Sequence, residues 1–332
     1  MFNINNPEVK FAINAVRQAA ELVKTVQTET AKNALTKGDK SPVTVADFAS
    51  QALVSHMLMQ EFPDAVLVGE EASDALKEEG AEHLLEAVTN YTARYIPESE
   101  PDTVCEWIDR GAADATKRFW TLDPIDGTKG FIRGDQYAVA LALVEDGEVQ
   151  IGVLGCPNLT NGYISEPGGT GTLVIAVRGQ GTWLTGMANA EKNDWQRIQT
   201  SPRANPSEAR LMRSFESGHT DVSKIDEISS ALGVEVEPVR MDSQAKYAVL
   251  AVGKGEVILR LLSPKMPNYQ EKIWDQAAGS IVLEEAGGCI SDLDGKPLDF
   301  SVERKLINNR GVLATNGLLH EAALKALRDV GA

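Results

Sequence analysis

Residues 120–133 read WTLDPIDGTKGFIR, and this stretch combines a strand pattern with an unusual pair of acids. The apolar run is typical of a buried strand and ends in Asp123 and Asp126, with a proline and Ile125 between them. A turn stabilised by an Asx hydrogen bond needs only one of these carboxylates. If the proline fixes the chain and Gly127 reverses it, both carboxylates and the Ile125 carbonyl face one point. Such oxygen ligands suit Mg²⁺, so the residues leave two interpretations open, a simple turn or a magnesium site.

The charge balance narrows the classes of ligand. The chain has 332 residues, with 48 acidic and 32 basic side chains and a formal net charge of -16. This charge repels the backbone of nucleic acids and no Lys/Arg cluster offsets it, so we expect no nucleic-acid polymer as a partner. If the substrate is a small anion, bound metal is the obvious source of positive charge. The length favours two packed lobes.

Cysteines, apolar runs and the N-terminal residues argue against four further classes of protein. Cys105, Cys156 and Cys289 are far apart, odd in number and without zinc-ligand spacing, so we expect neither a disulfide framework nor a zinc site. The longest apolar runs, such as residues 137–144, are too short to span a membrane, and the N-terminus does not resemble a signal peptide. We therefore expect a cytoplasmic protein without a membrane partner.

The first part of the chain predicts helices followed by strands. One helix is expected to begin at Asn6 and Pro7, and another at Thr44 as N-cap, with Asp47 completing its first turn. A short buried strand over 65–68 follows.

Next, the polar residues 73–115 predict an irregular peripheral insertion with some helix near 84–88. Residues 137–144 and 149–154, joined by the turn 145–147, predict a hairpin.

The second part of the chain alternates between strand-like and helix-like segments beyond residue 205, which is typical of an α/β arrangement. We expect an antiparallel-rich first lobe, residues 1–160, to meet an α/β second lobe, residues 161–332. A hairpin is expected over 289–300 and a last helix over 318–330. A site between the lobes is the default location for a ligand.

Further acidic residues stand at the ends of predicted elements. Glu70 and Glu71 follow the strand at 65–68, and Asp275 stands where a helix is expected to begin. Each has an ordinary explanation: Asp47 completes a capping box, Asp275 interacts with a helix dipole, and the two glutamates are solvated. Taken one at a time, these residues do not decide between that explanation and a metal site.

Taken together, these motifs resemble those of a known family. GEE at 69–71, DPIDGT at 123–128 and WDQAAG at 274–279, preceded by TVAD at 44–47, are similar to the signature of the lithium-sensitive, Mg²⁺-dependent phosphatases related to inositol monophosphatase. Three such motifs in the same order are a specific signal.

Within that superfamily the chain most resembles the 3'(2'),5'-bisphosphate nucleotidases. The strings that carry this resemblance include SFESGH at 214–219, DSQAK at 242–246 and VILRL at 257–261. The resemblance extends over nearly the whole chain, apart from residues 73–115 and 160–200.

The resemblance implies a fold and a reaction. The fold is a layered αβαβα sandwich of the inositol monophosphatase and fructose-1,6-bisphosphatase type, with both α+β and α/β character. The reaction is the Mg²⁺-dependent release of the 3'-phosphate of 3'-phosphoadenosine 5'-phosphate, giving AMP. A second candidate substrate is 3'-phosphoadenosine 5'-phosphosulfate. The resemblance also implies inhibition by Li⁺, with Na⁺ and Ca²⁺ as further candidate inhibitors, and it favours a monomer.

The resemblance also implies how the acidic residues share two to three magnesium ions. Glu70, Asp123 and the Ile125 carbonyl would hold the first ion, and Asp123, Asp126 and Asp275 the second. A third ion would share Glu70 with water molecules. Asp123 would therefore bridge two ions, which accounts for the paired aspartates.

Catalytic and substrate roles follow from the same resemblance. Asp47 and Thr128 would form a catalytic dyad, in which Thr128 orients the attacking water. The residues implied at the substrate are Gly127, Thr128, His219, Ser243, Lys246, Arg260 and Asp275. Lys246 and Arg260 would pair with the 5'-phosphate, and His219 would lie near the base. Each of these three side chains has an ordinary alternative as a surface or packing residue.

Two alternatives to the nucleotidase remain open. An inositol phosphate phosphatase or another sugar phosphatase would use the same metal site, and only the strings on the nucleotide side argue against it. A phosphonucleotide sensor would keep the fold without turning its ligand over, although the dyad and the metal ligands are all present.

Overall fold

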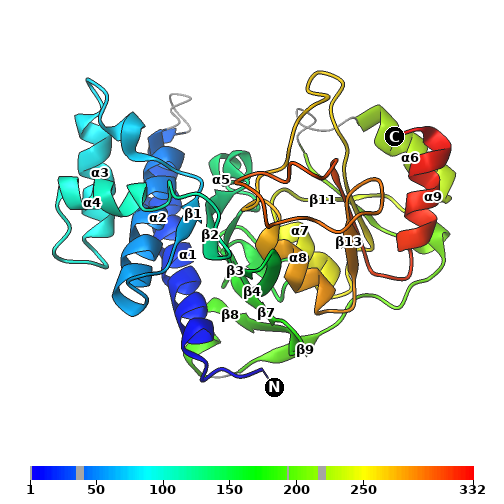
Figure 1. The fold of residues 1–332 in the computed structure, drawn as a ribbon, viewed down its shortest axis with the longest axis horizontal. Coiled ribbons are helices and arrows are strands. Elements are labelled where there is room, and N and C mark those ends of the chain that lie inside the picture. Colours follow the sequence, from blue (N-terminus) through cyan, green and yellow to red (C-terminus); the bar gives the residue numbers. More distant parts are fainter. Residues whose placement is uncertain (1, 35–40, 193, 216–221) are drawn as a thin grey trace.

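The computed structural model describes residues 2–34, 41–192, 194–215 and 222–332, which form five alternating layers of helix and sheet (Figure 1). Two long helices cover one face of the first sheet, two short helices lie between the sheets, and two more cover the far face of the second sheet. In that order the helices are α1 (Pro7–Ala34) and α2 (Ser41–Glu61), α7 (Ala245–Ala251) and α8 (Ala277–Glu284), and α6 (Val222–Leu232) and α9 (His320–Val330). The predicted αβαβα sandwich is confirmed.

The first sheet is seven-stranded within the described residues and has the order β1-β2-β3-β4-β7-β8-β9. Its strands are β1 (Leu67–Gly69), β2 (Arg118–Asp126), β3 (Ala138–Glu145), β4 (Glu148–Cys156), β7 (Thr172–Val177), β8 (Gly181–Gly186) and β9 (Gln196–Ile198). Only the β1–β2 pair is parallel among these. The predicted hairpin is confirmed, because β3 and β4 pair in an antiparallel ladder. Asp146 (φ 49°) and Gly147 (φ 81°) supply the left-handed backbone of the tight turn between them.

The second sheet has the order β11-β10-β12-β14-β13 in the described residues. Its strands are β10 (Leu211–Arg213), β11 (Val239–Arg240), β12 (Val257–Arg260), β13 (Cys289–Ser291) and β14 (Val312–Thr315). The hairpin predicted over 289–300 is wrong, because β13 pairs with β14 instead. After β13 the backbone N–H groups of Asp294 and Lys296 bond the Asp292 carboxylate, so this segment forms a loop rather than a ladder.

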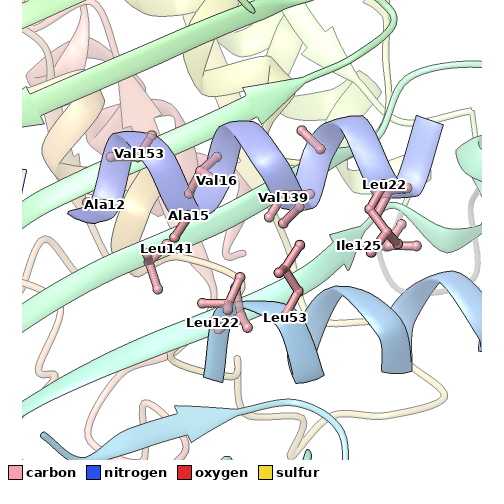
Figure 2. Close-up of a cluster of buried hydrophobic side chains, with 14 of the residues drawn as sticks. Ala12, Ala15, Val16, Leu22, Leu53, Leu122, Ile125, Val139, Leu141 and Val153 are labelled. Carbon is pink, nitrogen blue, oxygen red and sulfur yellow. The ribbon is translucent and has the colours of Figure 1, made fainter. Parts of the chain in front are cut away.

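Alternation along β3 supplies both sides of the first sheet with apolar surface. Val139 and Leu141 face the α1–α2 layer, where they meet Val16 of α1 and Leu53 of α2 (Figure 2). The alanines that alternate with them, Ala138, Ala140 and Ala142, face the α7–α8 layer. Small residues on this second face let α8 approach closely, since a Cβ on Gly152 of β4 would lie 2.8 Å from a backbone oxygen of that helix.

The division between the sheets differs from the predicted lobe boundary at residue 160. Strand β4 continues its hydrogen bonding into β7, so the first sheet extends to Ile198. The residues between β4 and β7 contain only a small separate ladder of β5 (Leu159–Thr160) and β6 (Ile164–Ser165). The second sheet begins with β10, after the 3₁₀ turns η2 (Met187–Lys192) and η3 (Pro206–Glu208).

Helix α1 begins where the sequence predicts, whereas α2 begins earlier. Asn6 caps α1 as predicted, since its side-chain oxygen accepts from the N–H groups of Glu8 and Val9. The N-cap predicted at Thr44 is wrong, because α2 already begins at Ser41, and Asp47 therefore lies in its second turn.

The segment 73–115 contains the helix predicted near 84–88, but it is more regular than the predicted irregular insertion. It forms η1 (Ser73–Leu76), α3 (Glu82–Thr92) and α4 (Pro101–Asp109), and both helices pack against α2. Val88 and Val104 are buried in this contact, so a few apolar positions are enough to dock a mostly polar segment. Among the described residues, no helix is both long and apolar enough to cross a membrane.

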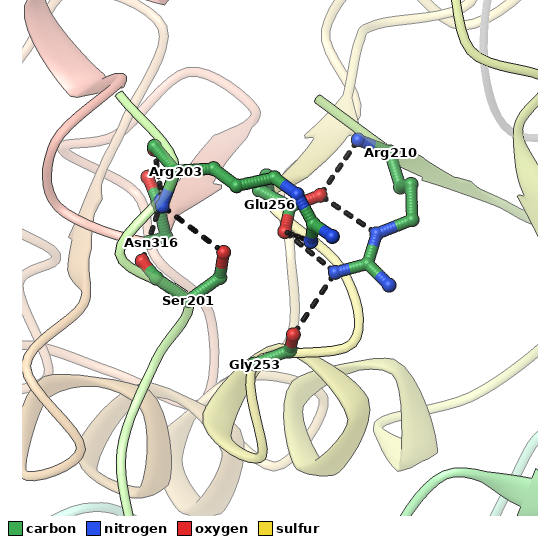
Figure 3. Close-up of polar contacts among 6 residues, drawn as sticks. All are labelled: Ser201, Arg203, Arg210, Gly253, Glu256 and Asn316. Carbon is green, nitrogen blue, oxygen red and sulfur yellow. Dashed lines mark hydrogen bonds and ion pairs between the residues drawn. The ribbon is translucent and has the colours of Figure 1, made fainter. Parts of the chain in front are cut away.

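A buried ion network holds the segment that leads from β9 of the first sheet to β10 of the second (Figure 3). Glu256 is fully buried, and its carboxylate accepts hydrogen bonds from Arg203 (2.9 Å) and from two side-chain nitrogens of Arg210 (2.7 and 3.0 Å). Asn316 bonds the Ser201 and Arg203 carbonyls beside it. Burial alone would raise the pKa of Glu256, but the hydrogen bonds from Arg210, Ser201 and Arg203 together lower it.

Glu256→Gln is therefore expected to destabilise the protein at pH 7 by about 2 kcal/mol, because both arginines lose their anionic partner. The network stabilises the fold fully above the unfolded-state pKa and loses its effect as the pH falls through the lowered folded-state pKa. Urea unfolding of both proteins should show a gap at pH 7 that narrows below about pH 4.5. A gap that stays constant with pH would show that the carboxylate charge is not responsible.

Candidate active site

A bulge in β2 brings the two aspartates of the DPID motif to the same side of the sheet. Asp123 pairs with Ala140 and Asp126 with Ala138, so three steps on β2 correspond to two on β3. Pro124 and Ile125 thus lie opposite one residue of β3, and Pro124 has no N–H to contribute to the ladder. The turn predicted at Pro124 is therefore wrong, because the strand continues through the motif to Asp126.

The bulge also changes which way the side chains face. Leu122 and Ile125 both contribute to the core under α1 and α2 although they are three residues apart. In a regular strand, side chains three apart face opposite sides of the sheet. The inserted residue thus returns Asp123 and Asp126 to one side, where both line the same cavity.

Gly127 joins this strand to the short helix α5 (Thr128–Arg133). Its φ of 93° is a left-handed conformation that glycine adopts without strain. A Cβ at this position would also lie 2.8 Å from the Cβ of Ser243, another residue with positive φ (66°). Glycine therefore allows the segment before α7 to approach the DPID motif closely.

The cavity between the sheets has a volume of about 300 Å³ and combines acidic with basic side chains. Its acidic part contains Glu70 from the end of β1, Asp123 and Asp126 from β2, and Asp275 from just before α8. The remaining lining residues are Ile125, Gly127, Thr128, Lys129, Gly130, Arg213, Ser214, Ile225, Asp242, Ser243, Lys246, Leu259, Arg260 and Tyr269. A larger cavity of about 910 Å³ beside α1 and α2 contains none of the predicted site residues.

The acidic side chains repel one another strongly. Burial first, and then the neighbouring carboxylates, raise the pKa of Asp123 well above its ordinary value. Burial also raises the pKa of Asp275, although Arg260 opposes the shift. Burial first, and then the charge of Asp126, raise the pKa of Glu70 as well. So many carboxylates can ionise together only if positive charge enters the cavity.

The donor set fits a hard divalent cation. The Asp123 Oδ1 atom is buried and has no hydrogen-bond partner, as expected of an oxygen reserved for a ligand. Carboxylate oxygens with a backbone carbonyl are the ligands that Mg²⁺ prefers. In the ranges that the structure describes, no three His, Cys, Asp or Glu side chains already converge as a complete metal shell. The carboxylates thus surround the cavity without meeting at one point.

The basic side of the cavity is held by buried hydrogen bonds. Lys246 of α7 is buried and donates to Ser214 Oγ (2.8 Å). Burial and the nearby Arg260 lower the pKa of Lys246 to about 8. Arg260, at the end of β12, pairs with the buried Glu271 at 2.7 Å. Both cations therefore face the anionic half of the cavity from fixed positions.

Asp126 connects the two sides of the cavity. Its Oδ2 atom accepts the backbone N–H of Gln244 at 2.7 Å, immediately before α7 begins. Burial raises the pKa of Asp126, whereas Arg260, Gln244 and Lys246 oppose that shift. The negative charge of Asp126 is thus stabilised by more groups of the protein than the charge of Asp123 or Asp275.

The predicted dyad is only partly assembled at the cavity. Thr128 lines it as the first residue of α5, whereas Asp47 lies on α2, which packs against β2 and α5. Asp47 is buried and its Oδ1 atom has no hydrogen-bond partner. Burial and then the charges of Glu71 and Glu70 raise its pKa well above the ordinary value.

The structure brings together Gly127, Thr128, Ser243, Lys246, Arg260 and Asp275 of the predicted substrate residues. His219 lies outside the described residues. Sequence reasoning missed Ser214, Tyr269 and Glu271, although Ser214 occurs in the quoted string SFESGH. Glu271 lies four residues before Asp275, and the one available signal was an acid close to a metal-site motif.

Comparison with known proteins agrees with this arrangement. The model of the inositol monophosphatase family matches residues 5–332. A "3'(2'),5'-bisphosphate nucleotidase" of Schizosaccharomyces pombe is 41% identical, over 97% of this chain and 95% of the relative. A protein of the same name from Oryza sativa is 42% identical, over 97% of this chain and 94% of the relative.

Solved structures show the same fold at lower identity. An inositol monophosphatase from Anabaena has a TM-score of 0.60 at 20% identity and covers 97% of both chains. Inositol monophosphatase II from Staphylococcus aureus has a TM-score of 0.63 at 17% identity, over 96% of this chain and 93% of the other. At these identities the likeness supports the fold and not a choice of substrate.

Proposed function

The chain belongs to the inositol monophosphatase family, and on this premise we propose that it is a Mg²⁺-dependent 3'(2'),5'-bisphosphate nucleotidase. It would hydrolyse the 3'-phosphate of 3'-phosphoadenosine 5'-phosphate to AMP and phosphate. The observation that carries this proposal is one cavity lined by Glu70, Asp123, Asp126 and Asp275 together with the cations Lys246 and Arg260. Relatives named for this activity are about 40% identical over nearly the whole chain, which supports the same choice of substrate.

The acidic residues would hold the magnesium ions. Glu70, Asp123 and the Ile125 carbonyl would bind one ion, and Asp123, Asp126 and Asp275 another, with a third sharing Glu70. When bound, Mg²⁺ acidifies water and neutralises the charge that develops during phosphoryl transfer. We further propose inhibition by Li⁺, and by Na⁺ and Ca²⁺ as additional candidates.

Thr128 and Asp47 would control the attacking water. The threonine hydroxyl accepts a hydrogen bond from that water and donates its own proton toward the Asp47 carboxylate, which fixes the water in line with the leaving oxygen. Asp47 performs this role only when ionised. Positive charge in the neighbouring cavity favours that form and counters the effect of burial on its pKa.

The basic side chains would recognise the second phosphate. Lys246 and Arg260 reach the cavity from α7 and β12, and a charge-assisted hydrogen bond to phosphate contributes about 1.5–3 kcal/mol. Gly127 and Ser243 would line the sugar and phosphate path, and His219 would lie near the base. A substrate with only one phosphate cannot form these additional bonds to Lys246 and Arg260, which favours substrates with a second anionic group, including 3'-phosphoadenosine 5'-phosphosulfate as a second substrate.

The test is product analysis with and without metal. With Mg²⁺, 3'-phosphoadenosine 5'-phosphate should yield equal amounts of AMP and phosphate, resolved by anion-exchange chromatography, and EDTA should stop the reaction. Binding of the nucleotide without any product would contradict the proposal and favour a sensor. A cytoplasmic monomer is part of the same proposal, and light scattering on the purified protein tests the oligomeric state.

Glu271→Gln is expected to raise KM for the bisphosphate about 10-fold with a smaller change in kcat. Glu271 holds the Arg260 guanidinium at 2.7 Å, and Gln276 in turn donates to Glu271 (2.9 Å). Without the carboxylate charge, Arg260 loses its fixed position, and one charged hydrogen bond to substrate is worth about 1.5 kcal/mol or more. Steady-state kinetics measures both constants. An unchanged KM would show that Arg260 does not bind the second phosphate.

A further inference from the structure

We propose that Arg304 is a positioning residue that sets the distance between Glu70 and Asp275 across the two sheets. Arg304 comes from the loop before β14 and has no place in the motifs that identify the family. The inference rests on the proposed function, because it concerns the residues that would hold Mg²⁺.

The guanidinium of Arg304 donates hydrogen bonds to three backbone carbonyls, one at the end of β1 and two in the segment after α4. Its Nη2 atom donates to the Gly69 carbonyl, and its Nη1 atom donates to the Gly111 (3.0 Å) and Ala113 (2.8 Å) carbonyls. Gly69 is the last residue of β1, directly before Glu70. Its own N–H bonds the Gly111 carbonyl at 2.8 Å, so the arginine secures a segment that is already paired.

The same side chain lies against the other metal-site segment. The guanidinium carbon is 5.0 Å from the ring centroid of Trp274, which is buried directly before Asp275. The Arg304 backbone carbonyl accepts the N–H of Ile273, and Lys305 pairs with Lys272 in an isolated antiparallel bridge. Arg304 is therefore fixed to the Asp275 segment by its backbone and to the Glu70 segment by its side chain.

This geometry makes one guanidinium the connection between two carboxylates that repel each other. Glu70, directly after β1, and Asp275, directly before α8, both line the cavity, so two like charges come from the two segments that Arg304 joins. Arginine suits the position because its planar fork donates several bonds in fixed directions, whereas a lysine ammonium on a flexible stem does not. Residues that orient metal ligands commonly change metal affinity 10- to 100-fold when substituted.

The experiment measures Mg²⁺ affinity without turnover. Tm is recorded against MgCl₂ concentration for the full-length wild-type protein and for Arg304→Lys, Arg304→Gln and Arg310→Lys, and the apparent Kd for Mg²⁺ is obtained relative to each protein's own Tm in EDTA. Arg310 is a matched control, since it pairs with Asp294 on the same loop region but away from the cavity.

Both Arg304 variants should bind Mg²⁺ about 10-fold more weakly than the wild type, and Arg310→Lys should bind it normally. If the Arg304 variants lose Tm in EDTA but keep the wild-type Kd for Mg²⁺, the role is only structural and the proposal is wrong. Failure of the proposed function is a separate result, because it would appear as a wild-type protein that releases no phosphate from the nucleotide.

Discussion

Asp123→Asn is expected to lower kcat for phosphate release by at least about 1000-fold, while the metal-free protein becomes more stable. Asp123 would bridge two magnesium ions, and loss of about 4 kcal/mol of transition-state stabilisation corresponds to this factor. Its carboxylate is buried, and burial first and then the charges of Glu70, Asp126 and Asp275 raise its pKa. A neutral amide of the same size removes that repulsion without leaving a cavity.

The stability change distinguishes a metal ligand from a structural aspartate. In EDTA the Tm of Asp123→Asn should exceed that of the wild type by about 2 °C for each kcal/mol of relieved repulsion. Saturating Mg²⁺ should reverse this order, since only the wild type gains the full binding energy. Asp64→Asn, at an exposed position just before β1, is the control. A variant that is inactive but less stable in EDTA would argue for a packing role instead.

Thr128→Ala should reduce kcat by about 100- to 1000-fold and change KM little, because the hydroxyl acts on the attacking water rather than on substrate binding. Thr128 is the first residue of α5 and lines the cavity, and alanine at this position retains the helix. Steady-state kinetics with 3'-phosphoadenosine 5'-phosphate measures both constants.

Two further variants make this second test specific. Thr128→Ser keeps a hydroxyl and should retain most of the activity. Asp47→Asn should resemble Thr128→Ala, and the double variant should be hardly worse than either single one, because the two residues would act as a unit. Full additivity of the two effects would contradict the dyad.

Elements with strong local signals were predictable from the sequence. The structure confirms three of them: the Asn6 cap, the β3–β4 hairpin and the last helix, α9. Each depends on residues close to one another in the chain. The β2 bulge was not predictable as such, because DPID has the composition of a turn. Only pairing with β3, which is set by the whole sheet, shows that the strand continues.

Long-range pairing accounts for the other differences. Strand β4 pairs with β7 across an intervening segment rich in glycine, so the first sheet extends beyond residue 160. In the candidate site, the motifs identified the acids at Glu70, Asp123, Asp126 and Asp275, which are found around one cavity. The partners that hold the site, such as Glu271 and Arg304, act through tertiary contacts that no local pattern indicates.

The central claim concerns the substrate, and one comparison tests it most directly. Phosphate release is measured with Mg²⁺ on 3'-phosphoadenosine 5'-phosphate, inositol 1-phosphate, inositol 1,4-bisphosphate and fructose 1,6-bisphosphate under the same conditions. We predict that kcat/KM for the nucleotide exceeds that for each of the other three by at least about 100-fold, equivalent to about 2.7 kcal/mol from the contacts to the second phosphate and the base. A higher kcat/KM for any inositol or sugar phosphate would contradict the nucleotidase assignment.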